Sequence, residues 1–272
     1  MIVFPNGKIN IGLNIVGKRT DGFHDLESVF YPVPIRDALE VVPADQFRFS
    51  AYGHPIPGKK DENLCLLASK SVQKLYPDLD EIEIILYKNI PMGAGLGGGS
   101  SDGACTLKLL NQYYELNLTD MQLLELASEL GSDCPFFIYN KPSWVRGRGE
   151  MISTIDLDLS SFSILLVYPD IHIDTAWAFS QITPKFPSVP IVELVKRPLA
   201  EWKSSVTNDF ELPVFNKFPP LASIKNKLYE AGALYASMTG SGSTIYGIFE
   251  KNVIPSISFD QNFRVDVINE LK

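Results

Sequence analysis

The chain has 272 residues, of which 45% are hydrophobic and 21% are charged. These are ordinary values for a folded globular protein and exclude a disordered or fibrous chain. With 24 Lys and Arg against 32 Asp and Glu, the net charge is −8, which disfavours general electrostatic binding of nucleic acid or of an anionic membrane surface. Any anionic ligand must therefore be bound locally. At roughly 150 residues per domain, the length predicts one large domain or two closely packed ones.

The cysteines and the N-terminus indicate the compartment. Cys65, Cys105 and Cys134 are odd in number and form no CxxC pair, so neither a disulfide framework nor a zinc site is indicated, and we expect a cytoplasmic protein. The first residues contain no apolar core of signal-peptide length. The longest uncharged run, 231–249, has a Gly- and Ser-rich centre, and we interpret it as a loop between strands rather than as a membrane span.

Residues 81–101 predict a strand, a loop and a helix in succession. The sequence EIEIIL at 81–86 alternates and then becomes apolar, which is typical of a strand, and Pro91 ends it. The glycine-rich stretch 93–99 follows. Residues 100–102, SSD, are good N-capping types and precede apolar residues at helical spacing. A helix is therefore predicted to begin there.

Further along the chain, Thr119 and Gln122 form a capping-box pattern that predicts a second helix, ending near Gly131. Beyond Ser143 the pattern changes to short strands and helices separated by turns. Strands are predicted at 162–168, 234–238, 244–249 and 263–268, and helices at 175–181, 207–215 and 221–231. Because this alternation lacks the regular rhythm of a doubly wound sheet, we predict an α+β fold with domains at 1–149 and 150–272.

The glycine-rich loop, residues 91–101, carries the strongest local signal. Five glycines in seven positions beside a helix start allow backbone N–H groups to converge on a phosphate, and the helix dipole adds partial positive charge there. A flexible connector is the alternative, but the strand before and the capped helix after favour phosphate binding. The residues expected to contact the nucleotide are Pro91, Met92, Gly93, Ala94, Gly95, Leu96, Gly97, Gly98, Gly99, Ser100 and Ser101.

Three common nucleotide-binding motifs do not fit this loop. Gly93, Gly95 and Gly98 match the spacing GxGxxG, but a dinucleotide-binding unit needs a second strand where 119–130 predicts a helix. A Walker A loop needs Gly-Lys-[Ser/Thr], whereas Gly99 is followed by serine. The HRD and DFG signatures of protein kinases are absent. A nucleotide loop of another type remains.

The loop, together with Pro5-x-x-Lys8-x-Asn10 before it and GSDCPF at 131–136 after it, resembles the GHMP kinase superfamily. The segments that resemble one branch of it are DGFH at 21–24, DENL at 61–64, GRGE at 147–150, NDFE at 208–211 and MTGSG at 238–242. The likeness extends from about residue 5 to about residue 250. Three positions depart from the usual pattern, where Gly7, Phe23 and Gly103 replace Ala, Tyr and Ala.

The resemblance implies the two-domain GHMP kinase fold, with an N-terminal ribosomal-protein-S5-like nucleotide-binding domain and a C-terminal ferredoxin-like α/β-plait domain. It implies ATP-dependent phosphorylation of the 2-hydroxyl of the methylerythritol part of a cytidine-diphosphate-linked substrate, giving ADP, in the non-mevalonate route to isoprenoid precursors. Mg²⁺ is expected to accompany ATP, and the sequence does not identify its ligands. We expect small-molecule partners, with neither nucleic acid nor membrane, and a monomer or homodimer.

Two residues are implied to carry the chemistry. By spacing alone, Asp133 is a turn residue between a helix and a strand, but the resemblance implies that it accepts the substrate hydroxyl proton as the γ-phosphoryl group arrives. Lys8 is implied to be the cation beside the same hydroxyl. Because Lys8 stands in an apolar strand between Pro5 and Ile9, its charge would need a carboxylate partner, and we hypothesise an Asp133–Lys8 pair.

The resemblance also implies a site for the cytosine base. It places the ring between Phe23 and Phe179, with His24 hydrogen-bonding the base and Asn10 reaching the substrate. Phe30 is assigned to the same site. An amphipathic core helix explains Phe179 equally well, and Trp177 is an alternative stacking residue.

Other assignments are less specific. Asn63 is an ordinary N-cap type, and by resemblance Asn63 and Leu64 border the adenine pocket. Lys88 either approaches the nucleotide or is solvated. The second glycine loop, 240–243, is by analogy a packing loop near the substrate and the first strand. Cys105 and Cys134 are given no function, since a buried small cysteine is the default.

Two other functions remain open at this stage. One is another small-molecule kinase of the superfamily, such as a homoserine or mevalonate-pathway kinase, but the aromatic residues around DGFH favour a substrate that carries a base. The other is a catalytically silent nucleotide-binding module. The presence of both Lys8 and Asp133 argues against it.

Overall fold

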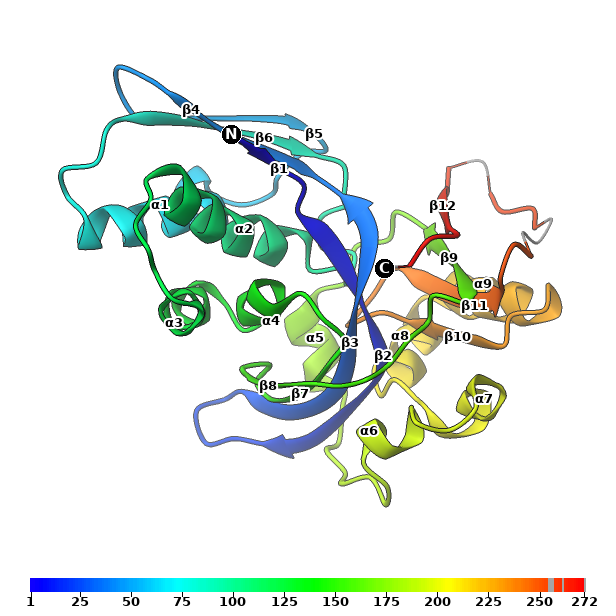
Figure 1. The fold of residues 1–272 in the computed structure, drawn as a ribbon. Coiled ribbons are helices and arrows are strands. Elements are labelled where there is room, and N and C mark those ends of the chain that lie inside the picture. Colours follow the sequence, from blue (N-terminus) through cyan, green and yellow to red (C-terminus); the bar gives the residue numbers. More distant parts are fainter. Residues whose placement is uncertain (254–256, 261, 272) are drawn as a thin grey trace. The chain divides into compact units, whose positions relative to one another are not determined.

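Three β-sheets and the helices beside them form two compact units in the structure, a computed structural model that describes residues 1–253, 257–260 and 262–271 (Figure 1). Unit 1 comprises Met1–Gly7, Ile35–Met92 and Gly97–Lys141. Unit 2 comprises Lys8–Pro34, Gly93–Leu96 and Pro142–Lys272. Both helices and strands are present, so the α+β prediction is confirmed.

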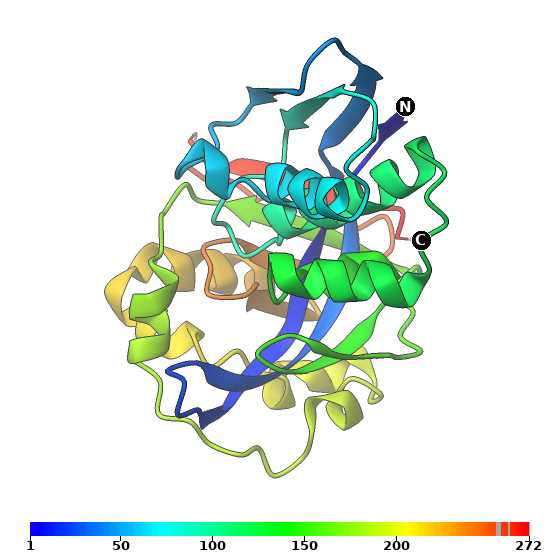
Figure 2. The ribbon, with the colours of Figure 1, turned by 90° about the vertical axis from the view of Figure 1, so that its left-hand side faces the viewer.

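Unit 1 contains one sheet, in the order β1-β4-β6-β5. Its strands are β1 (Ile2–Val3), β4 (Ala38–Pro43), β5 (Arg48–Gly53) and β6 (Ile82–Lys88). Its helices are η1 (Lys60–Glu62), α1 (Leu64–Leu75), α2 (Gly98–Tyr113), α3 (Asp120–Leu130) and α4 (Cys134–Tyr139), and they lie on one side of the sheet (Figures 1 and 2). Alternate residues of β6 are buried, which is the pattern that predicted this strand.

Unit 2 contains two sheets, in the orders β2-β3-β7-β8 and β10-β11-β9-β12. The strands of the first are β2 (Asn6–Lys18), β3 (His24–Arg36), β7 (Ser143–Gly147) and β8 (Met151–Thr154). Those of the second are β9 (Phe162–Tyr168), β10 (Tyr235–Met238), β11 (Ile245–Glu250) and β12 (Arg264–Ile268). The first two residues of β2, 6–7, and the last two of β3, 35–36, belong to unit 1.

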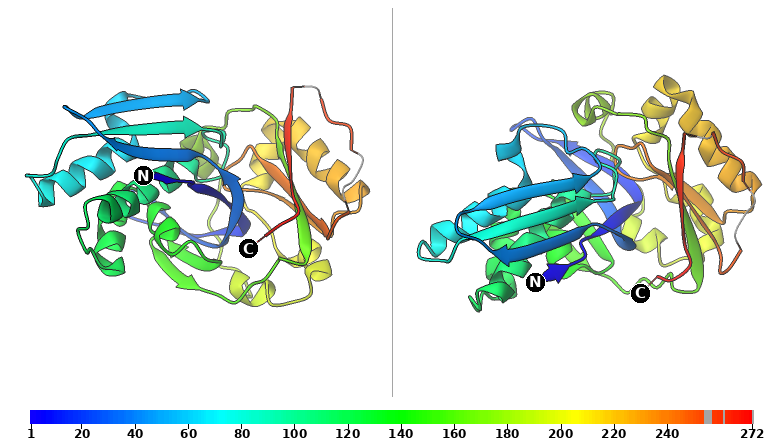
Figure 3. Two further views of the ribbon diagram at one scale, coloured as in Figure 1. Left: turned by 45° about the horizontal axis from the view of Figure 1, so that its top comes forward. Right: turned by 90° about the horizontal axis from the view of Figure 1, so that it is seen from above.

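The helices of unit 2 are α5 (Thr175–Ser180), α6 (Ile191–Leu194), η2 (Leu199–Glu201), α7 (Trp202–Ser205), α8 (Glu211–Lys217) and α9 (Pro219–Glu230). Of these, α7 and α9 contact the second sheet, and α8 shares its core. A buried apolar core joins α8 and α9 to one face of this sheet and includes Val167, Val214, Ile224, Leu228 and Ile245. The ribbon views of Figure 3 show α9 beside this sheet. Met238, the last residue of β10, belongs to this core, and the 239–244 turn follows it.

Most predicted elements are present, and two of the helices begin at other residues than expected. The helix predicted at 207–215 begins only at Glu211, because Leu13 and Asn208 form a parallel β-bridge and Asp209 N donates to Leu13 O at 2.8 Å. The helix predicted to begin at 100–102 starts earlier, at Gly98, with Gly97 as its N-cap. The strands predicted at 234–238 and 244–249 flank a turn as expected, and none of the described helices is long and apolar enough to span a membrane.

The capping box of α3 is present as predicted. Gln122 N donates to Thr119 Oγ1 at 3.4 Å, and Thr119 N donates to Gln122 Oε1 at 3.0 Å. Gly131 is the C-cap of the helix, and its N–H bonds to Ala127 O at 3.3 Å. The local sequence therefore fixes both ends of this helix.

We expect Thr119→Ala to lower the free energy of unfolding by about 1 kcal/mol, because an N–H at the helix start loses its acceptor. Urea denaturation measures the change. Ser128→Ala is the matched control, since its exposed hydroxyl bonds only to Leu124 O of the same helix, and it should change stability by less than about 0.5 kcal/mol. Equal effects of the two substitutions would contradict the role of the cap.

Candidate active site

Three successive carbonyl groups of the glycine-rich loop, at residues 94–96, accept hydrogen bonds from within unit 2. The donors are, in order, Thr244 N at 3.3 Å, Thr239 Oγ1 at 2.9 Å and Lys8 N at 2.9 Å. In a trans peptide the C=O and the following N–H point in opposite directions. The N–H groups of residues 95–97 therefore point away from these donors, toward the side where an anion can be bound.

The backbone of the loop alternates through the left-handed region. Gly93, Gly95 and Gly97 have φ angles of +67°, +80° and +68°, a conformation that brings successive N–H groups into an anion-binding concavity. A Cβ at Gly95 would lie 2.0 Å from Thr239 O, so this position accepts only glycine. Helix α2 follows directly and adds the positive end of its dipole. The geometry supports the predicted phosphate site.

A buried lysine cluster, formed by Asp37, Lys88 and Asp102, lies beneath the other end of the loop, in unit 1. Lys88 Nζ donates to Asp102 Oδ2 at 2.7 Å and also to Asp37 Oδ2, and each residue is at most 3% exposed. Asp37 Oδ1 accepts from the backbone N–H groups of Asn89 and Ile90. Lys88 is thus not solvated, and the cluster joins the end of β6 to the first turns of α2.

The sequence contained a signal for the burial of Lys88. Alternate positions of β6, at Ile82, Ile84 and Leu86, face the core, and the same period places Lys88 on that face. Burial alone would lower the pKa of Lys88, but the carboxylates of Asp102 and Asp37 outweigh it and raise the pKa. Asp102 was expected at the helix cap and instead lies inside α2.

Asp102 has an unusual environment for a carboxyl group. Burial and the neighbouring charge of Asp37 raise the pKa of Asp102 to about 8, although Lys88 opposes the shift. Its Oδ1 atom has no hydrogen-bond partner in the described part of the chain. A proton on this carboxyl would leave the cluster with balanced charge, one carboxylate against one ammonium.

A cavity of about 500 Å³ opens in unit 1 beside the buried lysine cluster. Four residues predicted to contact the nucleotide line it: Asn63, Leu64, Met92 and Gly99. Lys88 and Asp102 also face it, together with residues 51–60, which the sequence analysis did not single out. Asn63 is the N-cap of α1, and its side chain accepts from Cys65 N at 2.9 Å. The cavity has the size of a nucleotide-base site.

Lys8 is buried in β2, as predicted, at 4% exposure. Its Nζ donates to Asn10 Oδ1 at 2.5 Å and lies 4.4 Å from the centre of the Phe30 ring. Asn10 Nδ2 in turn donates to Ser28 Oγ at 3.0 Å. Lys8, Asn10 and Phe30 are therefore brought together, and Phe30 presents a ring face to the cation.

Asp133 precedes a short helix rather than a strand. It is the N-cap residue of α4, and the apolar run 136–138 is helical, which corrects the expectation of a strand there.

Burial raises the pKa of the Cys134 thiol to about 12 and that of Cys105 to about 11, so both remain protonated thiols near neutral pH. All three cysteines are free.

The structure brings His24 and Phe179 together in unit 2. Their rings are stacked, with centroids 5.1 Å apart and planes inclined by 22°. Trp177 packs instead edge-on against Phe218, under the ammonium of Lys217. Phe179, not Trp177, is therefore the aromatic residue beside His24.

Phe23 lies at the exposed tip of the hairpin formed by β2 and β3. Its side chain is 54% exposed, and the Arg148 guanidinium lies 5.1 Å from its ring centre. An exposed ring under a guanidinium is a surface on which a planar base can stack.

No group of three or more His, Cys, Asp or Glu side chains able to hold a metal occurs within the described ranges.

The chain matches two family models and is similar in sequence to known proteins. Residues 63–141 match the GHMP kinases N terminal domain, and residues 191–257 match the GHMP kinases C terminal domain. A protein of Bacteroides thetaiotaomicron named 4-diphosphocytidyl-2-C-methyl-D-erythritol kinase is 48% identical over 267 residues, which is 96% of this chain and 97% of that protein. A protein of Parabacteroides distasonis with the same name is 46% identical over 251 residues, 92% of each chain.

Solved structures show the same relationship. The crystal structure of a 4-(cytidine 5'-diphospho)-2C-methyl-D-erythritol kinase superposes with a TM-score of 0.79 at 29% identity and covers 93% of this chain and 90% of that one. A crystal structure of mevalonate kinase gives a TM-score of 0.73 at 14% identity, covering 100% and 99% of the two chains. The second likeness concerns the fold alone.

Replacing Asp102 by Asn should change how stability depends on pH. The unfolded chain releases the Asp102 proton near pH 4, whereas the folded chain keeps it to about pH 8. The stability that this group contributes is therefore complete below about pH 4 and is lost as the pH rises to about 8. Urea denaturation should show wild-type stability falling relative to Asp102→Asn between about pH 5 and 8. Parallel pH profiles would contradict the assignment.

Gly95→Ala should displace the loop, because its Cβ would collide with Thr239 O and the φ angle is unfavourable for alanine. We expect the affinity for an ATP analogue to fall at least roughly tenfold, since a displaced backbone loses its phosphate contacts. Isothermal titration calorimetry measures it. The matched control is Gly17→Ala, whose Cβ would meet its nearest atom at an ordinary 3.4 Å. Unchanged affinity of Gly95→Ala would show that the loop does not bind phosphate.

Proposed function

The chain belongs to the 4-diphosphocytidyl-2-C-methyl-D-erythritol kinases, a branch of the GHMP kinases, and we propose that its residues perform this reaction as follows. ATP is the co-substrate, and its γ-phosphoryl group is transferred to the 2-hydroxyl of the methylerythritol part of the cytidine-diphosphate-linked substrate. The products are ADP and the 2-phosphate. The observation that carries the proposal is the glycine-rich loop, whose carbonyls are held at 94–96 while the opposite N–H groups remain available to the triphosphate.

Asp133 is the proposed general base. An alcohol is a weak nucleophile near neutral pH, so the hydroxyl proton must pass to a base as the oxygen approaches the γ-phosphorus. The new P–O bond forms in line with the breaking bond to the β-phosphate oxygen, and ADP leaves with that electron pair. This role rests on the family relationship and on the position of Asp133 at the start of α4.

Lys8 supplies positive charge beside the reacting hydroxyl and, in this proposal, pairs with Asp133. Its ammonium is already oriented by Asn10 Oδ1 and by the ring of Phe30. A fixed cation in a buried environment stabilises developing negative charge more strongly than one in water. Phe30, at 2% exposure, would thus support the cation rather than stack on a base.

The cytidine end is proposed to bind at Phe23, His24 and Phe179, with Asn10 reaching the substrate. The stacked His24 and Phe179 rings form one aromatic surface, and the exposed Phe23 ring offers another. A base stacked on an aromatic ring gains about 1–3 kcal/mol. This requirement for a base separates the proposed substrate from homoserine and mevalonate, which carry none.

The adenine end is proposed to occupy the cavity bordered by Asn63 and Leu64, with the triphosphate along residues 91–101. Mg²⁺ is proposed to accompany ATP, because this ion is usually held by substrate phosphates and only one or two protein oxygens. The first turn of α2 offers such a donor in the hydroxyl of Ser100, whereas Ser101 is completely buried. When bound, the ion would neutralise charge on the β- and γ-phosphates.

Three further properties belong to the proposal. We propose a domain boundary at residues 149/150, with the two family matches on either side of it. We propose a cytoplasmic location, supported by the three free cysteines. We propose that the protein acts as a monomer or a homodimer.

Asp133→Asn should lower kcat by roughly 10²–10⁴-fold, because the amide cannot accept the hydroxyl proton. The rate of ADP release with the cytidine substrate measures the effect of the substitution on kcat. The same assay with homoserine and with mevalonate measures the substrate preference of the wild-type enzyme. The matched control is Asp120→Asn, an exposed carboxylate in the first turn of α3, which should leave kcat unchanged. Turnover of Asp133→Asn within a few-fold of wild type would reject the base. Faster turnover of homoserine or mevalonate would reject the substrate.

A further inference from the structure

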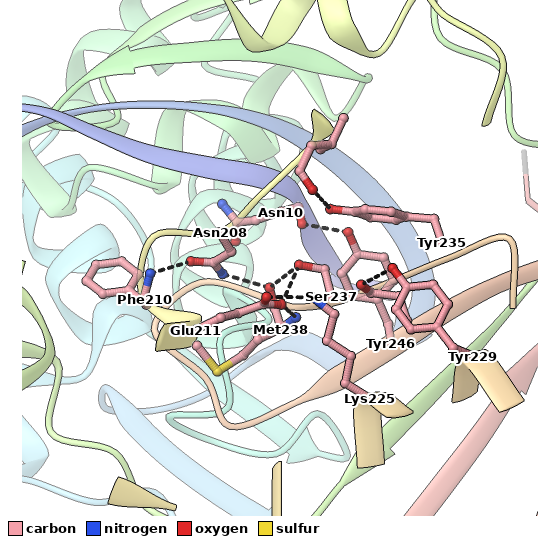
Figure 4. Close-up of polar contacts among 12 residues, drawn as sticks. Asn10, Asn208, Phe210, Glu211, Lys225, Tyr229, Tyr235, Ser237, Met238 and Tyr246 are labelled. Atoms are coloured by element: carbon pink, nitrogen blue, oxygen red, sulfur yellow. Dashed lines mark hydrogen bonds and ion pairs between the residues drawn. The ribbon is translucent and has the colours of Figure 1, made fainter. Parts of the chain in front are cut away.

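Two residues of the 208–211 segment, Asn208 and Glu211, bind the end of β10 and the start of the second glycine loop (Figure 4). Asn208 is 3% exposed, and its Nδ2 donates to Met238 O at 2.8 Å and to Gly240 O at 2.9 Å. Its Oδ1 accepts from Phe210 N at 2.9 Å, which fixes the orientation of the amide. One side chain therefore binds the carbonyls on both sides of Thr239.

Glu211, at the start of α8, also binds the end of β10, where its carboxylate accepts hydrogen bonds from polar groups that Asn208 does not contact. Its Oε1 accepts from Met238 N at 2.8 Å and from Ser237 Oγ at 2.9 Å, and its Oε2 accepts from Lys225 Nζ at 2.5 Å (Figure 4). The carboxylate is only 13% exposed. Charge-assisted hydrogen bonds of this kind are short and directional, so Glu211 fixes the end of β10 against α8 and α9.

Thr239 transmits this placement to the reaction site. It is fully buried, and its Oγ1 accepts from Asn10 N at 3.0 Å and lies 2.9 Å from Gly95 O and 3.2 Å from Asn10 Oδ1. A hydroxyl has one proton, and the shorter contact assigns it to the carbonyl of the glycine-rich loop. Thr239 thus contacts both the phosphate loop and the residue that orients Lys8.

Asn10 completes the connection. Its Oδ1 accepts from Lys8 Nζ. Its backbone carbonyl accepts from Tyr246 Oη at 2.8 Å (Figure 4). Hydrogen bonds, together with the backbone of residues 238–240, therefore connect Asn208 and Glu211 to the Lys8 ammonium and to Gly95 O. All of its members lie in unit 2.

We propose that Asn208 and Glu211 are positioning residues for phosphoryl transfer and that they act through the hydroxyl of Thr239. They fix the backbone on both sides of Thr239, so that its Oγ1 holds Gly95 O and Asn10 N at a constant spacing. The phosphate loop and the Lys8 cation are then placed by one buried group. The inference rests on the proposed function, because it matters only if Lys8 and the loop act on the same transferred group.

The first test removes the hydroxyl without changing the volume of the side chain. Thr239→Val should lower the single-turnover rate constant of phosphoryl transfer by roughly tenfold to 10²-fold, because small misplacement of reacting groups has effects of this size. A rate constant reports only folded enzyme, so partial unfolding does not imitate the result. Thr239→Ser, which keeps the hydroxyl, should restore the rate constant to within about threefold of wild type.

The second test asks whether Asn208 acts through Thr239. If it does, adding Asn208→Ala to Thr239→Val should lower the rate constant little further, although Asn208→Ala alone lowers it by roughly tenfold or more. Asn208→Ser, which keeps one donor, replaces Asn208→Ala if that variant does not fold. Glu211→Gln, which keeps an acceptor for Met238 N and Ser237 Oγ, should retain more activity than Glu211→Leu. Additive effects in the double variant would overturn the proposed route.

The matched control is Tyr229→Phe. The Tyr229 hydroxyl donates to Ala236 O of β10 at 3.1 Å, and it binds neither Thr239 nor the residues next to Thr239 in the described part of the chain. It should lower the melting temperature slightly and leave the rate constant unchanged. If wild-type enzyme does not phosphorylate the cytidine substrate, the proposed function fails. If wild-type enzyme is active and Thr239→Val keeps its rate constant, only the positioning role is overturned.

Discussion

The three hydrogen bonds to the carbonyls of residues 94–96 are the interaction on which the rest of this site depends. A glycine-rich loop is flexible by composition, and it binds phosphate well only if its N–H groups are oriented beforehand. Donors from Lys8, Thr239 and Thr244 supply that orientation by fixing the opposite side of each peptide. The loop therefore obtains its order from unit 2, whereas helix α2, which follows it, belongs to unit 1.

Buried polar groups serve different purposes in the two units. In unit 1, Lys88 sits between the carboxyl groups of Asp37 and Asp102 beneath the cavity, and removing Lys88 or Asp37 would leave an unpaired buried charge, which typically costs several kcal/mol. In unit 2, Asn208 and Glu211 bind backbone groups on either side of Thr239, and Thr239 in turn contacts Gly95 and Asn10. The first arrangement joins β6 to α2, and the second orients residues near the transferred group.

Much of the fold was predictable because it depends on local pattern. The alternation at 81–86, the capping box at Thr119 and the helix stop at Gly131 are confirmed. The start of α8 was not predictable, because residues 208 and 209 bond to β2 almost 200 positions earlier. Likewise, only one residue lies between Trp177 and Phe179, and only tertiary packing decides which of them meets His24. The burial of Lys88 was readable from its strand period, but its partners at 37 and 102 were not.

The most direct measurement is a crystal structure with a non-hydrolysable ATP analogue and the cytidine substrate bound together. We predict phosphate oxygens at about 2.7–3.2 Å from the amide nitrogens of Gly95, Leu96 and Gly97. We also predict that the Asp133 carboxylate lies within hydrogen-bond distance of the substrate hydroxyl that faces the γ-phosphate. Phosphates bound away from these amides, or a substrate hydroxyl without a hydrogen bond to Asp133, would contradict this mechanism.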